Sequence, residues 1–108
     1  MSKVKNPYLQ QKILSASPEQ LVCYIYDAGI TACKQKNSNK AGNAIRELIN
    51  ALNFDYKEMA VPLFDLYRYC LSMINAEKYN DAQEILEGLR QAWFDAHLKT
   101  NSTLEKAS

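Results

Sequence analysis

The sequence predicts an all-α fold, an antiparallel up-down four-helix bundle with a short N-terminal leader or helix. Apolar residues recur at helical spacing in four segments, and short polar or turn-forming stretches separate these segments. No segment shows the two-residue alternation of a strand. Apolar residues make up 47% of the 108 residues and there are only 3 Gly and 3 Pro, which is typical of one compact helical domain.

The chain is predicted to divide into a leader (1–16), the bundle (17–99) and a flexible tail (100–108). Residues 8–14 have the length of two helical turns. Isolated helices of that length are marginal in water, so this segment is ordered only if it docks, and is otherwise a frayed terminus.

The first long helix is predicted over residues 18–36. Ser17 is placed to accept from the backbone N–H of Gln20, whose side chain completes a capping box, and Pro18 suits the first helical position. The apolar positions continue from Leu21 through Ile25 to the end of the segment. This is the best-marked helix start in the chain.

The second and third helices are predicted over residues 40–52 and from about residue 60. Asp55 with Glu58 offers an earlier start for the third helix. That start would place Pro62 in the helix interior, which costs about 3 kcal/mol. We therefore expect the regular helix to begin near residue 60, with Pro62 in its first turn.

The fourth helix is predicted to begin at Asn80 or Asp81, because Glu84 completes a capping box for Asp81. Its apolar pattern ends by residue 99. Leu48 and Leu89 lie in the middle of the apolar stripes of the second and fourth helices, so replacing either by alanine is expected to cost about 2–5 kcal/mol.

Charge, hydropathy and cysteine content limit the classes of binding partner and the cellular compartment that are expected for this protein. The net charge of +1 gives no basic surplus for nucleic acid or an anionic membrane, and no apolar stretch approaches the ~20 residues of a membrane span. No apolar signal-peptide region follows the first lysines, so a cytoplasmic protein is expected. The three cysteines lie in apolar helical patterns and are predicted to be buried free thiols: Cys23, Cys33 and Cys70.

No catalytic constellation is recognisable. The single histidine, His97, lies near the end of the last helix, where it complements the helix dipole. No glycine-rich phosphate loop, paired carboxylates or metal-ligand spacing occurs. The sequence therefore predicts a protein that is not an enzyme and has no cofactor and no metal.

The chain is rich in tyrosine, with seven residues of this type. Adjacent positions on a helix lie about 100° apart, so Tyr67 and Tyr69, which flank Arg68, are not both expected to point inward. Tyr24 and Tyr26 pose the same problem on either side of Ile25. Exposed tyrosines are either ordinary rim residues or part of a binding groove, because they offer apolar area with a polar tip.

Several motifs, taken in order, resemble the flagellar secretion chaperones of the FliS family. They are Asn6-Pro7-Tyr8, then Ala16-Ser17-Pro18 with Leu21-Val22 and Tyr26-Asp27, then Leu63-Phe64-Asp65-Leu66-Tyr67-Arg68, Asn80-Asp81, and finally Ala92-Trp93 with Asp95-Ala96. The likeness extends over nearly the whole folded chain and implies a shortened member, with the missing length near residues 34–40 and 80–93.

The resemblance implies a cytosolic export chaperone without catalysis. Such a protein binds the C-terminal segment of flagellin, or of a related filament subunit, as that segment folds into helices, and so prevents premature polymerisation. It implies that the first and third long helices form the groove and that the leader covers part of it. The residues expected in this groove and lid are Tyr8, Leu9, Ile13, Leu21, Tyr24, Ile25, Leu66, Tyr67, Tyr69 and Met73. The flagellar export gate is a further expected partner. The alternative function is a non-catalytic, homodimeric helical adaptor or regulatory protein that associates through its tyrosine-rich faces.

Overall fold

The computed structural model describes residues 15–99. Its four α-helices are α2 (Pro18–Lys34), α3 (Ser38–Asn50), α4 (Lys57–Asn75) and α5 (Tyr79–Phe94). A π-helical stretch, η1 (Asp95–Lys99), continues directly from α5. These residues contain no strand, and the predicted all-α, four-helix fold is confirmed.

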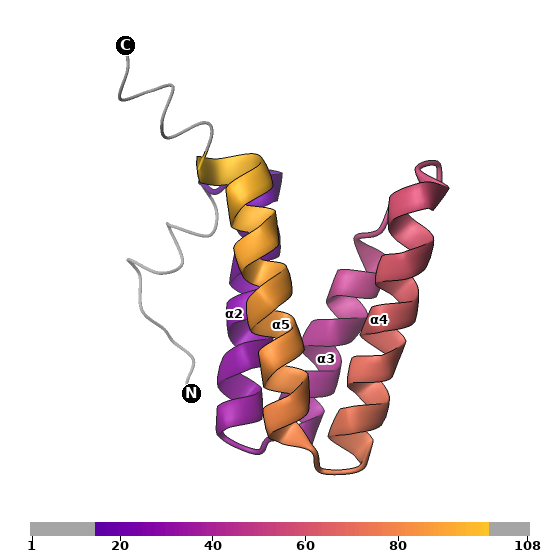
Figure 1. The fold of residues 1–108 in the computed structure, drawn as a ribbon. Helices are drawn as coiled ribbons and strands as arrows, with labels where there is room; N and C mark the ends of the chain where they lie inside the picture. Colours follow the sequence, from indigo (N-terminus) through magenta and orange to yellow (C-terminus); the bar gives the residue numbers. More distant parts are fainter. Residues whose placement is uncertain (1–14, 100–108) are drawn as a thin grey trace.

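The helices form an antiparallel bundle in which each helix packs against two neighbours (Figure 1). Helix α2 packs against α3 and α5, and α4 packs against the same two helices, so α2 and α4 occupy diagonal positions. Figure 1 shows the α2–α5 pair and the α3–α4 pair close together at the end that holds the α2–α3 and α4–α5 turns. At the opposite end the two pairs diverge.

The predicted cap at the start of α2 is confirmed. The Gln20 backbone N–H donates to Ser17 Oγ over 3.2 Å, and the Ser17 backbone N–H donates to Gln20 Oε1 over 3.0 Å. Pro18 occupies the first turn, where its missing N–H leaves no bond unmade. All the residues that determine this start lie within four positions of one another.

Replacing Ser17 by alanine is expected to lower the free energy of unfolding by about 1 kcal/mol, because the Gln20 N–H loses its acceptor. Urea denaturation measures this. Ser38→Ala is the matched control, since Ser38 is exposed and lies inside the first turn of α3, where Asn37 is the N-cap residue. Equal losses for the two variants would contradict the capping role.

The start of α4 differs from the prediction. The helix begins at Lys57, three residues earlier than expected, and Pro62 lies inside it. The hydrogen bond that Pro62 is unable to donate would have ended on the carbonyl of Glu58, which is an exposed residue in the first turn. Water satisfies a carbonyl at such a position, so the proline is tolerated there.

The start of α5 also differs from the prediction. The helix begins at Tyr79, and neither Asn80 nor Asp81 caps it, because its N-cap residue is Lys78, without a side-chain bond. The preceding turn sets this start. Glu77 is left-handed (φ 60°), and Lys78 N–H donates to the Met73 carbonyl over 2.8 Å, which closes a Schellman motif at the end of α4. The next helix follows at once.

The α2–α3 turn is closed in the same way. Lys36 is left-handed (φ 55°), and Asn37 N–H donates to the Ala32 carbonyl over 2.9 Å. The Asn37 side chain then caps α3 by accepting from Lys40 N–H over 3.1 Å. Helix α3 therefore starts two residues before the predicted position. Both short turns bring their helices together at the narrow end of the bundle.

The core lies between all four helices. Its fully buried large side chains are Tyr26, Ile45, Ile74, Leu86, Cys33 and Cys70. All three cysteines are buried free thiols, as predicted. Burial, together with the neighbouring Cys33 thiol, raises the pKa of Cys70 to about 11, so this thiol is unreactive at neutral pH. The packing is tight at Gly29, because a Cβ there would lie 3.2 Å from Leu86 Cδ1 and 3.3 Å from the Ala44 Cβ.

A pair of tyrosine hydroxyls joins α2 to α4 across the core. The oxygens of Tyr26 and Tyr67 lie 2.6 Å apart, and both residues are buried. Burial raises the pKa of Tyr26 far above its usual value, and the hydrogen bond to Tyr67 raises it further. Burial also raises the pKa of Tyr67. Both hydroxyls therefore stay protonated in the folded state at alkaline pH.

This pair is expected to make the fold less stable at alkaline pH. Below pH 10, the ordinary tyrosine pKa, both groups are protonated in the folded and the unfolded chain. Because the pKa of each group is higher in the folded chain, the unfolded chain releases these protons at a lower pH than the folded chain does, so the free energy of unfolding falls as the pH rises. Urea denaturation between about pH 8 and about pH 11 measures this fall.

A Tyr26→Phe/Tyr67→Phe variant is expected to show a shallower fall than the native protein over that pH range. Tyr56→Phe/Tyr69→Phe is the control, because both of these tyrosines are exposed, and it is expected to keep the native slope. The same slope in all three proteins would contradict the assignment.

Candidate functional site

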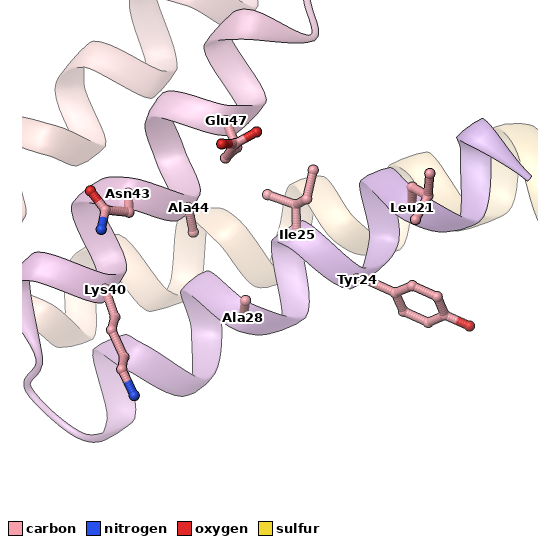
Figure 2. A pocket seen from close by; sticks show the side chains of 8 residues that line it. All are labelled: Leu21, Tyr24, Ile25, Ala28, Lys40, Asn43, Ala44 and Glu47. Atoms are coloured by element: carbon pink, nitrogen blue, oxygen red, sulfur yellow. The ribbon is translucent and has the colours of Figure 1, made fainter. Parts of the chain in front are cut away.

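A strongly apolar hollow of the described surface is a groove between α2 and α3 (Figure 2). It has a volume of about 500 Å³. Helix α2 contributes Leu21, Tyr24, Ile25 and Ala28, and α3 contributes Lys40, Asn43, Ala44 and Glu47. We call this hollow the α2–α3 groove.

The groove exists because α2 carries two apolar stripes. One stripe, with Tyr26 and Ile30, is buried in the core. The other, with Leu21, Ile25 and Ala28, follows the i, i+4, i+7 spacing of a helix face, and none of the helices within residues 15–99 covers it. Leu21 is 36% exposed, which is unusual for a leucine in the first long helix of a bundle. An uncovered apolar stripe of this kind is typical of a surface that binds a partner.

The opposite wall of the groove is polar. Lys40, Asn43 and Glu47 lie on one side of α3 at helical spacing, and all three are exposed. Figure 2 shows Lys40 beside Ala28 and Glu47 near Ile25. Within residues 15–99, neither the Lys40 ammonium nor the Glu47 carboxylate forms an ion pair. The groove therefore has an apolar floor and two uncompensated charges on its rim.

A second hollow of about 500 Å³ extends the groove past Tyr24 towards Thr31 and Gln35. From Leu21 to Gln35 the α2 surface measures about 21 Å, since a helix rises 1.5 Å per residue. That length accommodates about four turns of a docked helix.

Helix α2 is held in place on its α5 side. Arg90 Nε donates to Asp27 Oδ1 over 2.9 Å, and Arg90 Nη2 donates to Asp27 Oδ2 over 3.3 Å. This bidentate contact raises the pKa of Arg90. At the start of α2, Trp93 Nε1 donates to the Glu19 carbonyl over 2.9 Å. These bonds give the groove a rigid floor.

The predicted site residues fall into separate places. Leu21, Tyr24 and Ile25 lie together in the α2–α3 groove. Leu66, Tyr69 and Met73 lie on α4 and do not line it; Tyr69 is 52% exposed and the other two are half-buried. Tyr67 is 3% exposed and belongs to the core, where its hydroxyl pairs with Tyr26.

The structure places the hollow between α2 and α3, and not between the first and third long helices, because α2 and α4 lie diagonally and meet through the core. Tyr8, Leu9 and Ile13 lie outside the described residues.

Sequence reasoning missed five residues of the groove, Ala28, Lys40, Asn43, Ala44 and Glu47. Ala28 carried a signal, since it continues the Leu21–Ile25 spacing on the face that the core stripe does not use.

A third hollow lies at the wide end of the bundle, where the two helix pairs diverge. It measures about 460 Å³ and is lined by α2, α4, α5, η1 and the α3–α4 connection, with Leu52, Met59, Leu63 and Trp93 as its large apolar side chains. His97 closes one side by stacking on Trp93, with ring centroids 3.9 Å apart. Phe54, Tyr56, Met59 and Val61 are exposed around the nearby α3–α4 connection.

Among residues 15–99 no group of three or more His, Cys, Asp or Glu side chains is placed to hold a metal ion. None of the described helices combines the length and the apolar character needed to cross a membrane.

Comparison with known proteins gives one match. The family described as "Flagellar protein FliS" matches residues 1–100 of this chain. No curated protein and no solved structure matches. The family match covers nearly the whole chain and includes both walls of the α2–α3 groove.

Proposed function

The chain belongs to the FliS family of flagellar proteins, and from that premise we propose that it is a non-enzymatic, cytoplasmic flagellar export chaperone. Its client in this proposal is the C-terminal helical segment of flagellin or of a related filament subunit. Binding keeps that segment from polymerising before export.

The observation that supports this proposal is the uncovered apolar stripe of Leu21, Ile25 and Ala28 on α2, facing an open groove. An amphipathic helix fits such a groove by burying its own apolar stripe against it. A client segment that is disordered when free folds on binding, so its ordering entropy is subtracted from the contact energy.

Calorimetric titration with a flagellin C-terminal segment tests the proposal. We expect saturable binding with one segment per chaperone and a negative heat-capacity change, because apolar surface is buried. In a parallel assay the chaperone is expected to delay polymerisation of purified flagellin. Absence of binding under conditions where the chaperone is folded would reject this function.

A separate experiment tests the alternative, a homodimeric adaptor. The exposed Tyr56 and Met59 beside the α3–α4 connection favour a second contact surface. Size-exclusion chromatography with and without the flagellin segment separates the two functions. A dimer that ignores the segment would favour the adaptor, and a complex of one chaperone with one segment would favour the chaperone.

The leader gives a further prediction. If residues 1–14, with Tyr8, Leu9 and Ile13, cover the client surface, they compete with the client, and the apparent affinity is lowered by the covered fraction. Deleting residues 1–14 is then expected to tighten binding of the flagellin segment with little loss of thermal stability. Calorimetry and thermal melts measure the two effects.

Deleting residues 100–108 is the control truncation, and it is expected to leave binding unchanged. Clearly weaker binding by the protein without its leader, at unchanged stability, would mean that the leader belongs to the client surface. A sharp fall in melting temperature would instead mean that it belongs to the core.

A further inference from the structure

We infer that the two rim charges of the α2–α3 groove, on Lys40 and Glu47, set the direction in which a client helix lies in it. The occupant is an amphipathic helix of the client with an acidic side chain against Lys40 and a basic side chain against Glu47. This inference rests on the proposed function, which it extends from the client to the orientation of the bound segment.

Lys40 and Glu47 lie far enough apart along the groove to distinguish the two directions of a bound helix. Lys40 and Glu47 are seven residues apart on α3, which corresponds to about 10.5 Å along the helix axis. Figure 2 shows them at different places along the groove, Lys40 beside Ala28 and Glu47 near Ile25. Because α2 and α3 are antiparallel, Glu47 marks the end of the groove that holds Leu21. A helix with two opposite charges seven residues apart matches this rim in one direction and opposes it in the other.

The second step concerns the other charged groups at the groove. Asp27 lines the extension of the groove, but its carboxylate is already bonded to Arg90. Arg46, next to Glu47, lines neither the groove nor its extension, and its Nη1 donates to the Asn43 side-chain oxygen over 3.0 Å. Lys40 and Glu47 form no ion pair within residues 15–99. They are therefore the charges of this rim that remain for a partner.

The apolar floor of the groove does not favour either direction of a bound helix. Leu21, Ile25 and Ala28 form a stripe against which the apolar face of a helix packs in either direction. Charges at the rim of an interface contribute modestly to affinity, but they fix its register. One direction forms two pairs of opposite charges with the rim, and the other places like charges together at both positions. The affinities for the two directions are therefore expected to differ roughly tenfold.

Trp93 provides a reporter for the direction, because it is the single tryptophan of the chain. Its indole nitrogen is bonded to the Glu19 carbonyl, so it lies at the Leu21 end of the groove. Energy transfer from Trp93 to a dansyl group therefore shows which end of a labelled peptide lies there.

The probes are two peptides of about 20 residues with the same leucine stripe and no Trp or Tyr, each carrying a dansyl group at its N-terminus. The acid-first peptide has Glu seven residues before Lys, and the base-first peptide has the two exchanged. On the native protein the base-first peptide is expected to give strong transfer, because its N-terminal Lys faces Glu47. The acid-first peptide is expected to give weak transfer.

In the charge-exchanged protein, Lys40→Glu/Glu47→Lys, the two transfer efficiencies are expected to be exchanged. Both side chains are exposed, so the fold is expected to be kept, and circular dichroism checks this. The matched control is Lys57→Glu/Glu84→Lys, which exchanges the same charges at exposed positions of α4 and α5 outside the groove, and it is expected to behave as the native protein.

The inference is overturned by equal transfer from both peptides on the native protein, by an unchanged pattern in the charge-exchanged protein, or by binding of neither peptide. The proposed function is tested separately with the flagellin segment. Directional binding of the peptides without binding of that segment would reject the function and keep the inference, and the reverse result would do the opposite.

Discussion

Replacing Ala28 by glutamate is expected to weaken binding of a flagellin C-terminal segment by roughly a hundredfold, while the protein keeps its fold. Ala28 is an exposed residue that lines both the α2–α3 groove and its extension. In the free protein a glutamate there reaches water, and alanine and glutamate have similar helix propensity. In the complex the carboxylate would be carried into the apolar interface, and it would draw Lys40, the cation beside it, away from the client, so the apolar contact and one rim charge pair are both lost. Calorimetric titration measures the loss.

Ala92→Glu is the matched control for this variant. Ala92 is an exposed helical alanine on α5 and lines neither part of the groove. We expect its binding constant to stay within about threefold of the native value, since isolated surface substitutions have small effects. A folded Ala28→Glu protein that binds as tightly as the Ala92→Glu protein would exclude the α2–α3 groove as the client site. It would leave the exposed α4 surface of Tyr69 as the next candidate.

Replacing Leu86 by alanine is expected to lower the free energy of unfolding by about 2–5 kcal/mol, which is a large part of the stability of a small domain. Leu86 is 0% exposed. Its Cδ1 atom lies where α5 meets α2, so close to Gly29 that a Cβ on that glycine would be 3.2 Å away. Removing the leucine side chain leaves a cavity between the two helices, which the surrounding structure fills only in part. Urea denaturation measures the loss.

Leu89→Ala is the control for that prediction, and it revises an expectation from the sequence. The apolar periodicity assigned Leu48 and Leu89 equal importance, but Leu48 is buried and Leu89 is only partly buried at the edge of the core. We therefore expect the Leu89 variant to lose clearly less stability than the Leu86 variant. Losses of the same size would mean that the edge of the core is packed as tightly as its centre.

The fold was predictable because its main signals are local or periodic. The capping box of Ser17 and Gln20 involves neighbours in sequence, and the structure places both bonds as the sequence predicts. The starts of α4 and α5 were predicted wrongly, because in each case the cause lies outside the pattern of apolar residues. Pro62 is tolerated inside α4 because the carbonyl that lacks its donor, that of Glu58, belongs to an exposed residue. Lys78 is the N-cap residue of α5 because Glu77, in the left-handed conformation, closes the turn before it. Neither cause is visible in a pattern of apolar residues.

The candidate site was predictable only in part. Leu21 and Ile25 belong to a stripe that the sequence displays, whereas Lys40 and Glu47 belong to the site only because α3 lies beside that stripe. Which helices become neighbours depends on how the bundle closes, and periodicity does not contain that information. Similarly, the sequence showed that Tyr67 and Tyr69 do not both point inward. The structure was needed to show that Tyr69 is the exposed one.

The closure of the bundle by α5 has a consequence for the protein during its synthesis. Helices α2 and α3 leave the ribosome first, and α5 leaves last. Two contacts join α5 to α2. Arg90 and Asp27 are separated by 63 positions in the sequence, and Trp93 and Glu19 are separated by 74 positions. Contacts of such separation close late in folding, because loop-closure entropy opposes them.

Until they close, the nascent α2–α3 hairpin exposes the apolar stripe of the groove and the apolar stripe of the core together. The surface proposed to bind the client is thus present on the growing chain before the rest of its own fold protects it.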